Sequence, residues 1–177
     1  MMNRLLAPWR ALRQRYWASL LFDVFLILTV FWCIHAWQTR GLPGAGELPR
    51  LSATELDGDR TPQALPVAGK GVVYFFAPWC FYCKHSIGNI DELVHSGKVE
   101  WARAVALDFA DLQEVRDFVS EVGLEQPVLL GDAGTARDWN IRVFPTYFIV
   151  DEDGGISSRS VGYSTSLGLK TRALLAR

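Results

Sequence analysis

Hydrophobic positions fall into one long run near the N-terminus and a series of shorter runs after residue 50. The long run, residues 17–37, reads WASLLFDVFLILTVFWCIHAW. As a helix it would be about 30 Å long, which is enough to cross the hydrocarbon core of a bilayer. The pattern predicts a transmembrane anchor followed by a separate folded part.

The residues that flank this run give it a direction. Arg40 is the only nearby cation after it, whereas several arginines precede it: Arg4, Arg10, Arg13 and Arg15. Aromatic residues gather at its edges, as is common at membrane interfaces: Tyr16, Trp17, Trp32 and Trp37. The positive-inside rule therefore places residues 1–16 in the cytoplasm and everything after Trp37 outside.

Three other interpretations of the run are a cleaved signal peptide, lipoprotein processing at Cys33 and a buried core helix. Signal peptides have a shorter apolar region that ends in small residues, and Trp32 is too large for lipoprotein processing. A core helix would leave the arginine asymmetry unexplained. Asp23 is costly in a bilayer, so it either reaches the cytoplasmic interface or contacts a partner helix. Cys33 is expected to face the membrane as an apolar residue.

Beyond the anchor, residues 38–50 are rich in Gly and Pro and predict a linker, and residues 51–177 predict a folded domain. This domain begins with a short strand over 51–56. The apolar run 72–77 predicts a buried central strand, and helical character over 82–96 follows it.

Strands and helices continue to alternate to the end of the chain. A buried strand lies within 99–109, and Asp111 is expected to cap an amphipathic helix whose apolar face is formed by Leu112, Val115, Phe118, Val119 and Val122. The remaining predicted segments are a short apolar piece at 127–130, a helical turn at 133–139, strands at 146–150 and 156–163 joined by a hairpin turn at 151–155, and a last helix capped by Thr165. The order β-α-β-α-β-β-α predicts a mixed α/β domain.

Composition narrows the class of function. Half of the residues are hydrophobic, and the formal net charge of −1 gives no reason to expect a nucleic-acid partner. Three cysteines are too few for a disulfide scaffold. The chemistry is therefore sought in individual motifs.

Cys80 and Cys83 lie one helical turn apart, directly after the buried strand 72–77. At the start of a helix, Cys80 would meet free backbone N–H groups that favour its thiolate, and Cys83 would lie within disulfide distance. These are the parts of a thiol–disulfide exchanger. Two alternatives are a copper site built with His85 and a purely structural disulfide.

Pro145 starts the strand 146–150, because proline does not fit inside a central strand. A proline at this place is unremarkable alone. Together with the CxxC in this order of elements, its place resembles that of the cis-proline loop in thioredoxin folds, and this resemblance implies a cis-proline loop, Phe144-Pro145-Thr146, beside the cysteines.

The segment Trp79-Cys80-Phe81-Tyr82-Cys83-Lys84 resembles a thioredoxin active site. Further segments are similar to membrane-anchored, TlpA-like bacterial thioredoxins, especially the ScsD (suppressor for copper sensitivity) type: residues 55–58, 126–130, 144–151 and 161–165. The resemblance implies a thioredoxin-like α/β fold with an N-terminal transmembrane helix. It also implies a thiol–disulfide oxidoreductase in the periplasm of a Gram-negative bacterium, anchored in the inner membrane.

Some positions depart from the family pattern. Phe81-Tyr82 fills the place where relatives often carry a proline at the second position. Tyr74 stands where thioredoxins have a buried acid, and Ser86 stands where some TlpA-like reductases have a glutamate. These departures leave the acid–base helper unassigned.

We therefore expect Cys80 to attack protein disulfides and Cys83 to resolve the mixed disulfide, with no cofactor and no metal. Phe144, Pro145 and Thr146 are expected to dock the substrate chain as an extra strand. Trp79, Phe81 and Tyr82 would form an apolar contact surface or serve ordinary packing. A membrane electron-transfer partner would keep the protein reduced. The alternative is a copper-binding or chaperone-like module that uses the same cysteines without turnover.

Overall fold

The computed structural model describes residues 7–44, 46, 48–51, 53–57, 62–63, 65 and 69–176. The chain divides into two compact units, the first ending at Arg40 and the second beginning at Gly41. Each unit is described by itself.

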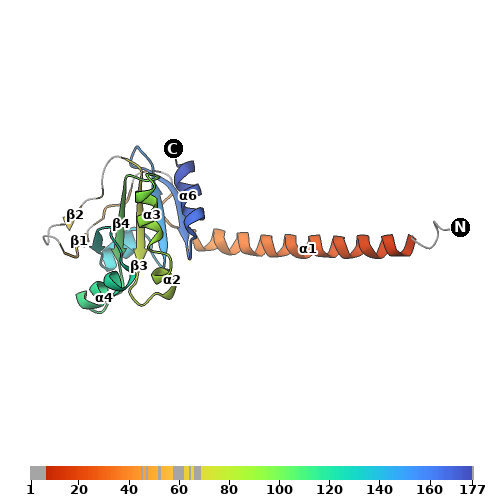
Figure 1. Cartoon of the computed structure of the whole chain (residues 1–177), viewed down its shortest axis with the longest axis horizontal. Coiled ribbons are helices and arrows are strands. Elements are labelled where there is room, and N and C mark those ends of the chain that lie inside the picture. Colours follow the sequence, from red (N-terminus) through yellow and green to blue (C-terminus); the bar gives the residue numbers. More distant parts are fainter. Residues whose placement is uncertain are drawn as a thin grey trace. The chain divides into compact units, whose positions relative to one another are not determined.

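The first unit contains helix α1 (Ala7–Gln38), drawn red to orange in Figure 1. It starts ahead of the predicted anchor and ends one residue beyond it. Of the helices in the described residues, one is long and apolar enough to cross a membrane, over Tyr16–Gln38 of α1. Cys33 is exposed on this helix and forms no disulfide.

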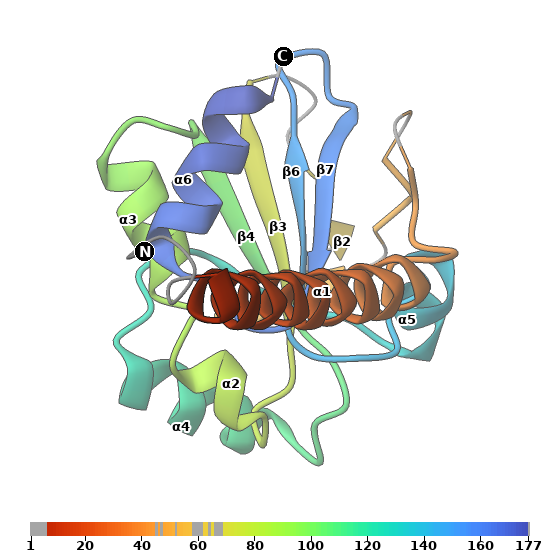
Figure 2. The same cartoon turned by 90° about the vertical axis from the view of Figure 1, so that its right-hand side faces the viewer.

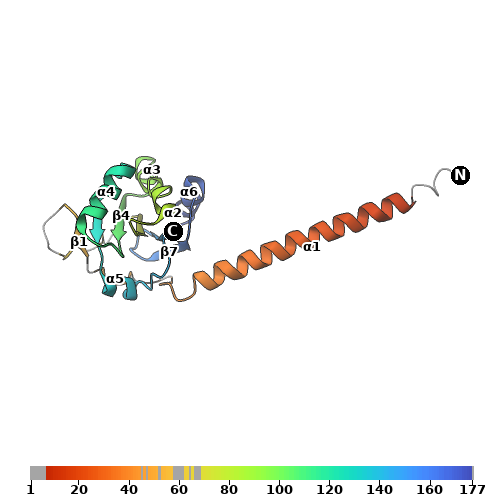
Figure 3. The same cartoon turned by 90° about the horizontal axis from the view of Figure 1, so that it is seen from below.

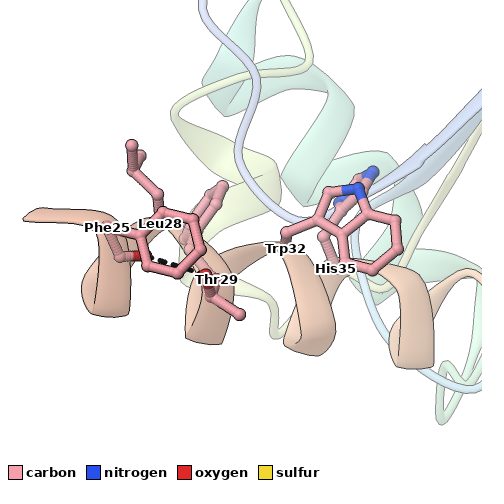
Figure 4. Close-up of a pocket in the computed structure, with 6 residues that line it drawn as sticks. Phe25, Leu28, Thr29, Trp32 and His35 are labelled. Atoms are coloured by element: carbon pink, nitrogen blue, oxygen red, sulfur yellow. Dashed lines mark hydrogen bonds between the residues drawn. The ribbon is translucent and has the colours of Figure 1, made fainter. Parts of the chain in front are cut away.

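One side of α1 carries a shallow apolar hollow, shown in Figure 4. Phe25, Leu28, Thr29, Trp32 and His35 are among the residues that line it. The Thr29 hydroxyl donates to the Phe25 carbonyl oxygen at 2.8 Å, so this polar side chain is satisfied within the helix itself. Such internal bonding suits a threonine in an apolar environment.

The second unit is built on a single sheet. Within its described residues seven strands pair in the order β2-β1-β5-β4-β3-β6-β7, and Figure 2 shows β4, β3, β6 and β7 side by side. The central strand β3 is parallel to β4 and antiparallel to β6. The strands are β1 (Ala53–Glu55), β2 (Pro62–Gln63), β3 (Gly71–Phe76), β4 (Trp101–Ala106), β5 (Val128–Leu130), β6 (Thr146–Val150) and β7 (Ile156–Val161).

Helices cover both faces of the sheet, as Figure 3 shows from below. They are α2 (Phe81–Lys84), α3 (Asn89–His95), α4 (Leu112–Val122), α5 (Ala133–Asp138) and α6 (Ser166–Leu175). One core joins Tyr74 and other residues of the sheet to α2, α3, α4 and α6. The other core contains Phe75, Phe148 and Trp139, the residue that follows α5. The alternation of Tyr74 and Phe75 between the two cores follows from the period of two in a strand.

The cap of α4 is present as predicted. An oxygen of the Asp111 carboxylate accepts a hydrogen bond from the Glu114 backbone N–H at 2.9 Å, and the Glu114 side chain accepts from the Ala110 N–H at 2.8 Å. The helix ends at Gly123, whose φ of 62° is readily adopted by glycine. Thr165 likewise caps α6 by accepting from the Gly168 N–H at 3.2 Å.

The helix predicted over 82–96 is divided into α2 and α3. The Cys83 carbonyl oxygen accepts hydrogen bonds from Ser86 N–H at 3.1 Å and from Ile87 N–H at 2.9 Å. The bond from Ser86 spans three residues instead of four, which tightens the chain into turns before Gly88. The first strand is also shorter than predicted, the strand after the hairpin ends at Val161, and β2 was not predicted.

Leu42 and Gly46, in the segment predicted as a linker, contact other parts of the second unit. Leu42 and Leu51 are buried with the core residues Trp139 and Phe148. The Gly46 carbonyl oxygen accepts from the Ile156 N–H at 3.0 Å. Leucines between the Gly and Pro residues explain this packing, because burying them is favourable.

Candidate active site

Cys80 follows the buried strand β3 and occupies the N-cap position of α2. Its sulfur accepts a hydrogen bond from the Cys83 backbone N–H, with a distance of 3.2 Å between N and Sγ. Helix α2 has only four residues, so this single N–H matters more to the sulfur than a helix dipole does. The local structure therefore directs one backbone donor at Cys80.

Cys80 and Cys83 are joined by a disulfide, with 5.2 Å between their Cα atoms. Cys80 keeps 6% of its surface exposed, whereas Cys83 is fully buried at 0%. A reactive cysteine must be reached by its substrate, and a resolving cysteine only needs to reach its partner. Accessibility therefore supports Cys80 as the attacking residue.

The peptide bond between Phe144 and Pro145 is cis, which confirms the prediction from the sequence. In the antiparallel pairing of β3 with β6, Thr146 lies opposite Phe75. This register places the loop at the end of β3 from which the chain continues to the cysteines. The Thr146 hydroxyl donates to the Val143 carbonyl oxygen at 2.7 Å and closes the loop.

Three aromatic residues around the cysteines are exposed. Trp79, Phe81 and Tyr82 keep 61%, 67% and 60% of their surface accessible. The Phe81 ring meets Tyr82 edge to face at 5.7 Å and lies 4.4 Å from the His85 ring, measured between centroids. Exposed apolar groups gathered at one place are typical of contact sites. Of the two roles left open by the sequence, the exposure favours a contact surface.

A hollow of about 550 Å³ lies beside Phe144 and is lined by residues of three loops and of α5. Leu107, Ile141 and Phe144 contribute apolar walls, and Asp108 and Arg142 contribute charge. The backbone at Asp108 has a φ of 52°, which is uncommon outside glycine, and its carbonyl oxygen accepts from the Trp79 indole N–H at 2.9 Å. Sequence reasoning missed Asp108, because no local pattern marks a left-handed aspartate.

Tyr74 and Ser86, two of the positions that depart from the family pattern, are brought together. Their hydroxyl oxygens are 2.7 Å apart, and both side chains are buried. Burial raises the pKa of the Tyr74 phenol above its ordinary value, more than the hydrogen bond with Ser86 lowers it. The phenol is therefore protonated at neutral pH.

A copper site was one alternative for the cysteines. Within the described part of the chain, no group of three or more His, Cys, Asp and Glu side chains gathers as metal ligands would. His85 directs Nδ1 to the Phe81 carbonyl oxygen at 2.9 Å. Among the residues that the structure describes, the cysteine pair therefore does not gather with a third His, Cys, Asp or Glu side chain as a copper site would require.

The sheet, the paired cysteines and the cis-proline loop define a thiol–disulfide oxidoreductase of the thioredoxin fold. The model of the AhpC/TSA family matches residues 46–159, and the chain belongs to that family. The fold class and the enzyme class predicted from the sequence are confirmed.

Among curated proteins, the thiol-disulfide oxidoreductase ResA of Bacillus cereus is 32% identical over 124 residues, which are 67% of this chain and 70% of ResA. The thioredoxin-like protein YneN of Bacillus subtilis is 24% identical over 156 residues, covering 84% of this chain and 91% of YneN. These similarities are consistent with the TlpA-like subtype.

Solved structures share the fold. A thiol:disulfide interchange protein of the thioredoxin family from Chlorobium tepidum has a TM-score of 0.65 at 22% identity, covering 75% of this chain and 97% of that one. A secreted disulfide oxidoreductase of Mycobacterium tuberculosis has a TM-score of 0.61 at 20% identity, covering 71% of this chain and 96% of that one.

Proposed function

We propose that this protein is a membrane-tethered periplasmic oxidoreductase that reduces or isomerises disulfides in protein substrates. The observation that carries the proposal is the placement of Cys80, which receives the Cys83 N–H and lies at the end of β3 next to the cis-proline loop. This arrangement supplies an attacking thiolate, a resolving thiol and a backbone edge for the substrate chain.

The reaction proceeds in two exchanges. The Cys80 thiolate attacks one sulfur of the substrate disulfide, a mixed disulfide forms, and the other substrate sulfur leaves as a thiolate that takes up a proton. Cys83 then loses its proton and attacks Cys80, which breaks the mixed disulfide and releases the second substrate thiol. The substrate gains two electrons and two protons, and the enzyme ends with the Cys80–Cys83 disulfide.

The cis-proline loop and the exposed aromatic residues near the sulfurs bind the substrate. Phe144, Pro145 and Thr146 dock the substrate backbone, and Trp79 with the Phe81-Tyr82 pair contacts its apolar side chains. The hollow beside Phe144 has room for a substrate side chain next to the docked backbone. Polypeptides with apolar residues around the disulfide are therefore the favoured substrates.

Location rests on helix α1 and the arginines that precede it. The span Tyr16–Gln38 anchors the chain in the bacterial inner membrane, and the positive-inside rule places the second unit in the periplasm. A membrane protein that donates electrons re-reduces the disulfide after each turnover.

Insulin reduction in the presence of dithiothreitol tests the activity. The full-length protein in detergent should accelerate the precipitation of insulin B chains, and Cys80→Ser should return the rate to that of dithiothreitol alone. A parallel copper titration tests the rival module. Copper retained at one equivalent per chain, with no insulin reduction by the wild type, would overturn the proposal.

A further inference from the structure

A continuous chain of hydrogen bonds links the central strand β3 to the sulfur of Cys80. The Tyr74 hydroxyl oxygen lies 2.7 Å from Ser86 Oγ, and the Ser86 hydroxyl donates to the Tyr82 carbonyl oxygen at 2.7 Å. That carbonyl and the Cys83 N–H belong to the same peptide group. The N–H of this group is the donor to Cys80 Sγ at 3.2 Å.

The direction of the chain follows from counting protons. A carbonyl oxygen only accepts, so the single hydroxyl proton of Ser86 is used in the bond to Tyr82. Ser86 therefore accepts from Tyr74, and the Tyr74 phenol must donate. The order of donors is Tyr74, then Ser86, then the Tyr82–Cys83 peptide, and the final acceptor is Cys80.

The surroundings keep this order fixed. Tyr74 and Ser86 are each exposed by only 1%, so water does not compete for their hydrogen bonds. Burial raises the pKa of Tyr74, and the phenol keeps the proton that it must donate. The Ser86 backbone N–H also donates to the Cys83 carbonyl oxygen at 3.1 Å, which holds the serine against the turn.

We propose that Tyr74 and Ser86 are positioning residues that orient and polarise the Tyr82–Cys83 peptide group, so that its N–H stabilises the Cys80 thiolate. Hydrogen bonds in a chain polarise one another, and the effect is larger where water is excluded. A hydroxyl that donates to the carbonyl end of a peptide strengthens its N–H as a donor. Neither residue gains or loses a proton in the reaction, so neither is an acid–base helper.

The proposal rests on the exchange function above and makes that function more specific. In the disulfide, Cys80 Sγ is neutral and gains little from the N–H. In the reduced protein, the Cys80 proton goes to solvent and the sulfur carries a full negative charge, which a backbone donor stabilises more strongly. The chain of bonds therefore acts on the reactivity of the reduced state.

Alkylation of Cys80 by iodoacetamide, measured from pH 5 to 10 on the reduced full-length protein, tests the proposal. Tyr74→Phe and Ser86→Ala should each shift the midpoint of the alkylation profile to higher pH and slow alkylation at pH 7 by up to about threefold, which is less than the loss of a whole hydrogen bond because the N–H donor to Sγ stays in place. Ser86→Thr keeps the hydroxyl and should stay near the wild-type profile.

Tyr147→Phe is the matched control. Tyr147 is as buried as Tyr74 and stacks on it with 6.2 Å between centroids, but its hydroxyl is bonded to Arg172 and not to the turn between the cysteines. Its profile should match that of the wild type. Unchanged midpoints in Tyr74→Phe and Ser86→Ala would overturn the proposal, as would an equal shift in Tyr147→Phe.

The two proposals fail separately. If the wild type does not reduce insulin while the alkylation midpoints shift as expected, the proposed function is wrong and the positioning role stands. If the wild type reduces insulin and the midpoints do not move, only the positioning role is wrong. Should Tyr74→Phe fail to fold, Ser86→Ala and Ser86→Thr provide the same comparison.

Discussion

The rings of Trp79 and Phe144 meet edge to face, with 5.8 Å between their centroids. Trp79 precedes Cys80, and Phe144 precedes the cis proline. The Trp79 indole also donates to the Asp108 carbonyl oxygen at 2.9 Å. Trp79 thus lies in the cysteine segment and contacts both the cis-proline loop and the loop that follows β4.

Replacing Trp79 or Phe144 by Ala should weaken substrate binding more than chemistry. Each variant is expected to raise the KM for a disulfide-containing peptide about tenfold, equivalent to about 1.4 kcal/mol, with kcat within about twofold of the wild type. In the double variant, the loss of binding free energy should be smaller than the sum of the losses in the two single variants, because the two rings contact each other. Steady-state peptide reduction provides both constants.

Leu167→Ala is the control for this pair, since Leu167 is an exposed apolar residue of α6 outside the contact surface. Its KM should not change. A fall in kcat at constant KM in Trp79→Ala would assign the ring to the chemical step and contradict the docking role.

Cys80→Ser and Cys83→Ala should fail in different ways. Without the Cys80 sulfur no attack takes place, and insulin reduction should drop to background. Cys83→Ala keeps the attacking sulfur and loses resolution, so mixed disulfides with substrates should accumulate and survive non-reducing electrophoresis. If Cys80→Ser accumulates them instead, the roles of the two cysteines are reversed.

Asp91 on α3 is expected to lower stability at neutral pH. Burial raises the pKa of its carboxyl group, more than the hydrogen bond from the Glu125 N–H lowers it. A folded-state pKa above the unfolded value favours the protonated form, so this contribution to stability is complete at low pH and is lost as the pH rises through the folded pKa.

Asp91→Asn should therefore be more stable than the wild type at pH 7, by less than about 1 kcal/mol because the group is partly screened by solvent. The difference should disappear below the unfolded pKa of an aspartate, about 3.9. Urea unfolding at pH 7 and pH 3 measures this difference in stability. Asp117→Asn is the control, because Asp117 is exposed. A variant less stable than the wild type at pH 7 would contradict the assignment.

The sequence was sufficient for the features that depend on local chemistry. Cys80 and Cys83 follow an apolar strand, and Pro145 precedes another, so their pairing in space could be predicted once the order of elements was known. Asp111 and Thr165 are caps that the next few residues determine. The caps are set by neighbours along the chain, and the place of Pro145 near the cysteines follows from the order of elements.

Features that depend on distant segments were not predictable. The Asp108 carbonyl, at a left-handed backbone position, is bonded by Trp79, and Leu42 is buried in the core that contains Trp139 and Phe148. The bond between Tyr74 and Ser86 joins a strand to a turn, and only the packed fold brings their hydroxyls together. A single sequence shows the residues but not these contacts.

The direction of α1 in the membrane is a further prediction. The positive-inside rule predicts that everything after Trp37 is exported. Alkaline phosphatase fused after residue 177 should therefore be active. A green fluorescent protein fused at the same place should not fluoresce when the chain is exported in unfolded form. Replacing Arg10, Arg13 and Arg15 by Asn should lower the phosphatase signal. A fluorescent wild-type fusion would place the cysteines in the reducing cytoplasm and remove the oxidising context that the proposal assumes.

The reduction potential decides the direction of electron flow. Two arguments about its value point in opposite directions. Similarity to TlpA-like proteins favours a reductase. The Cys83 N–H that points at Cys80 stabilises the thiolate, and a stabilised thiolate makes a protein more oxidising.

Other charges near the sulfurs add little to that effect. Phe81 and Tyr82 carry none, Lys84 is paired with Glu121, and His85 lies outside the CxxC with Nδ1 bonded to the Phe81 carbonyl oxygen. We therefore expect an intermediate to reducing potential, between about −170 and −270 mV, whereas strong oxidants lie near −120 mV. Equilibration with glutathione buffers, read by the fluorescence of Trp79 against a Trp79→Phe control, measures it. A value near −120 mV would make the protein an oxidase and reverse the direction of electron flow.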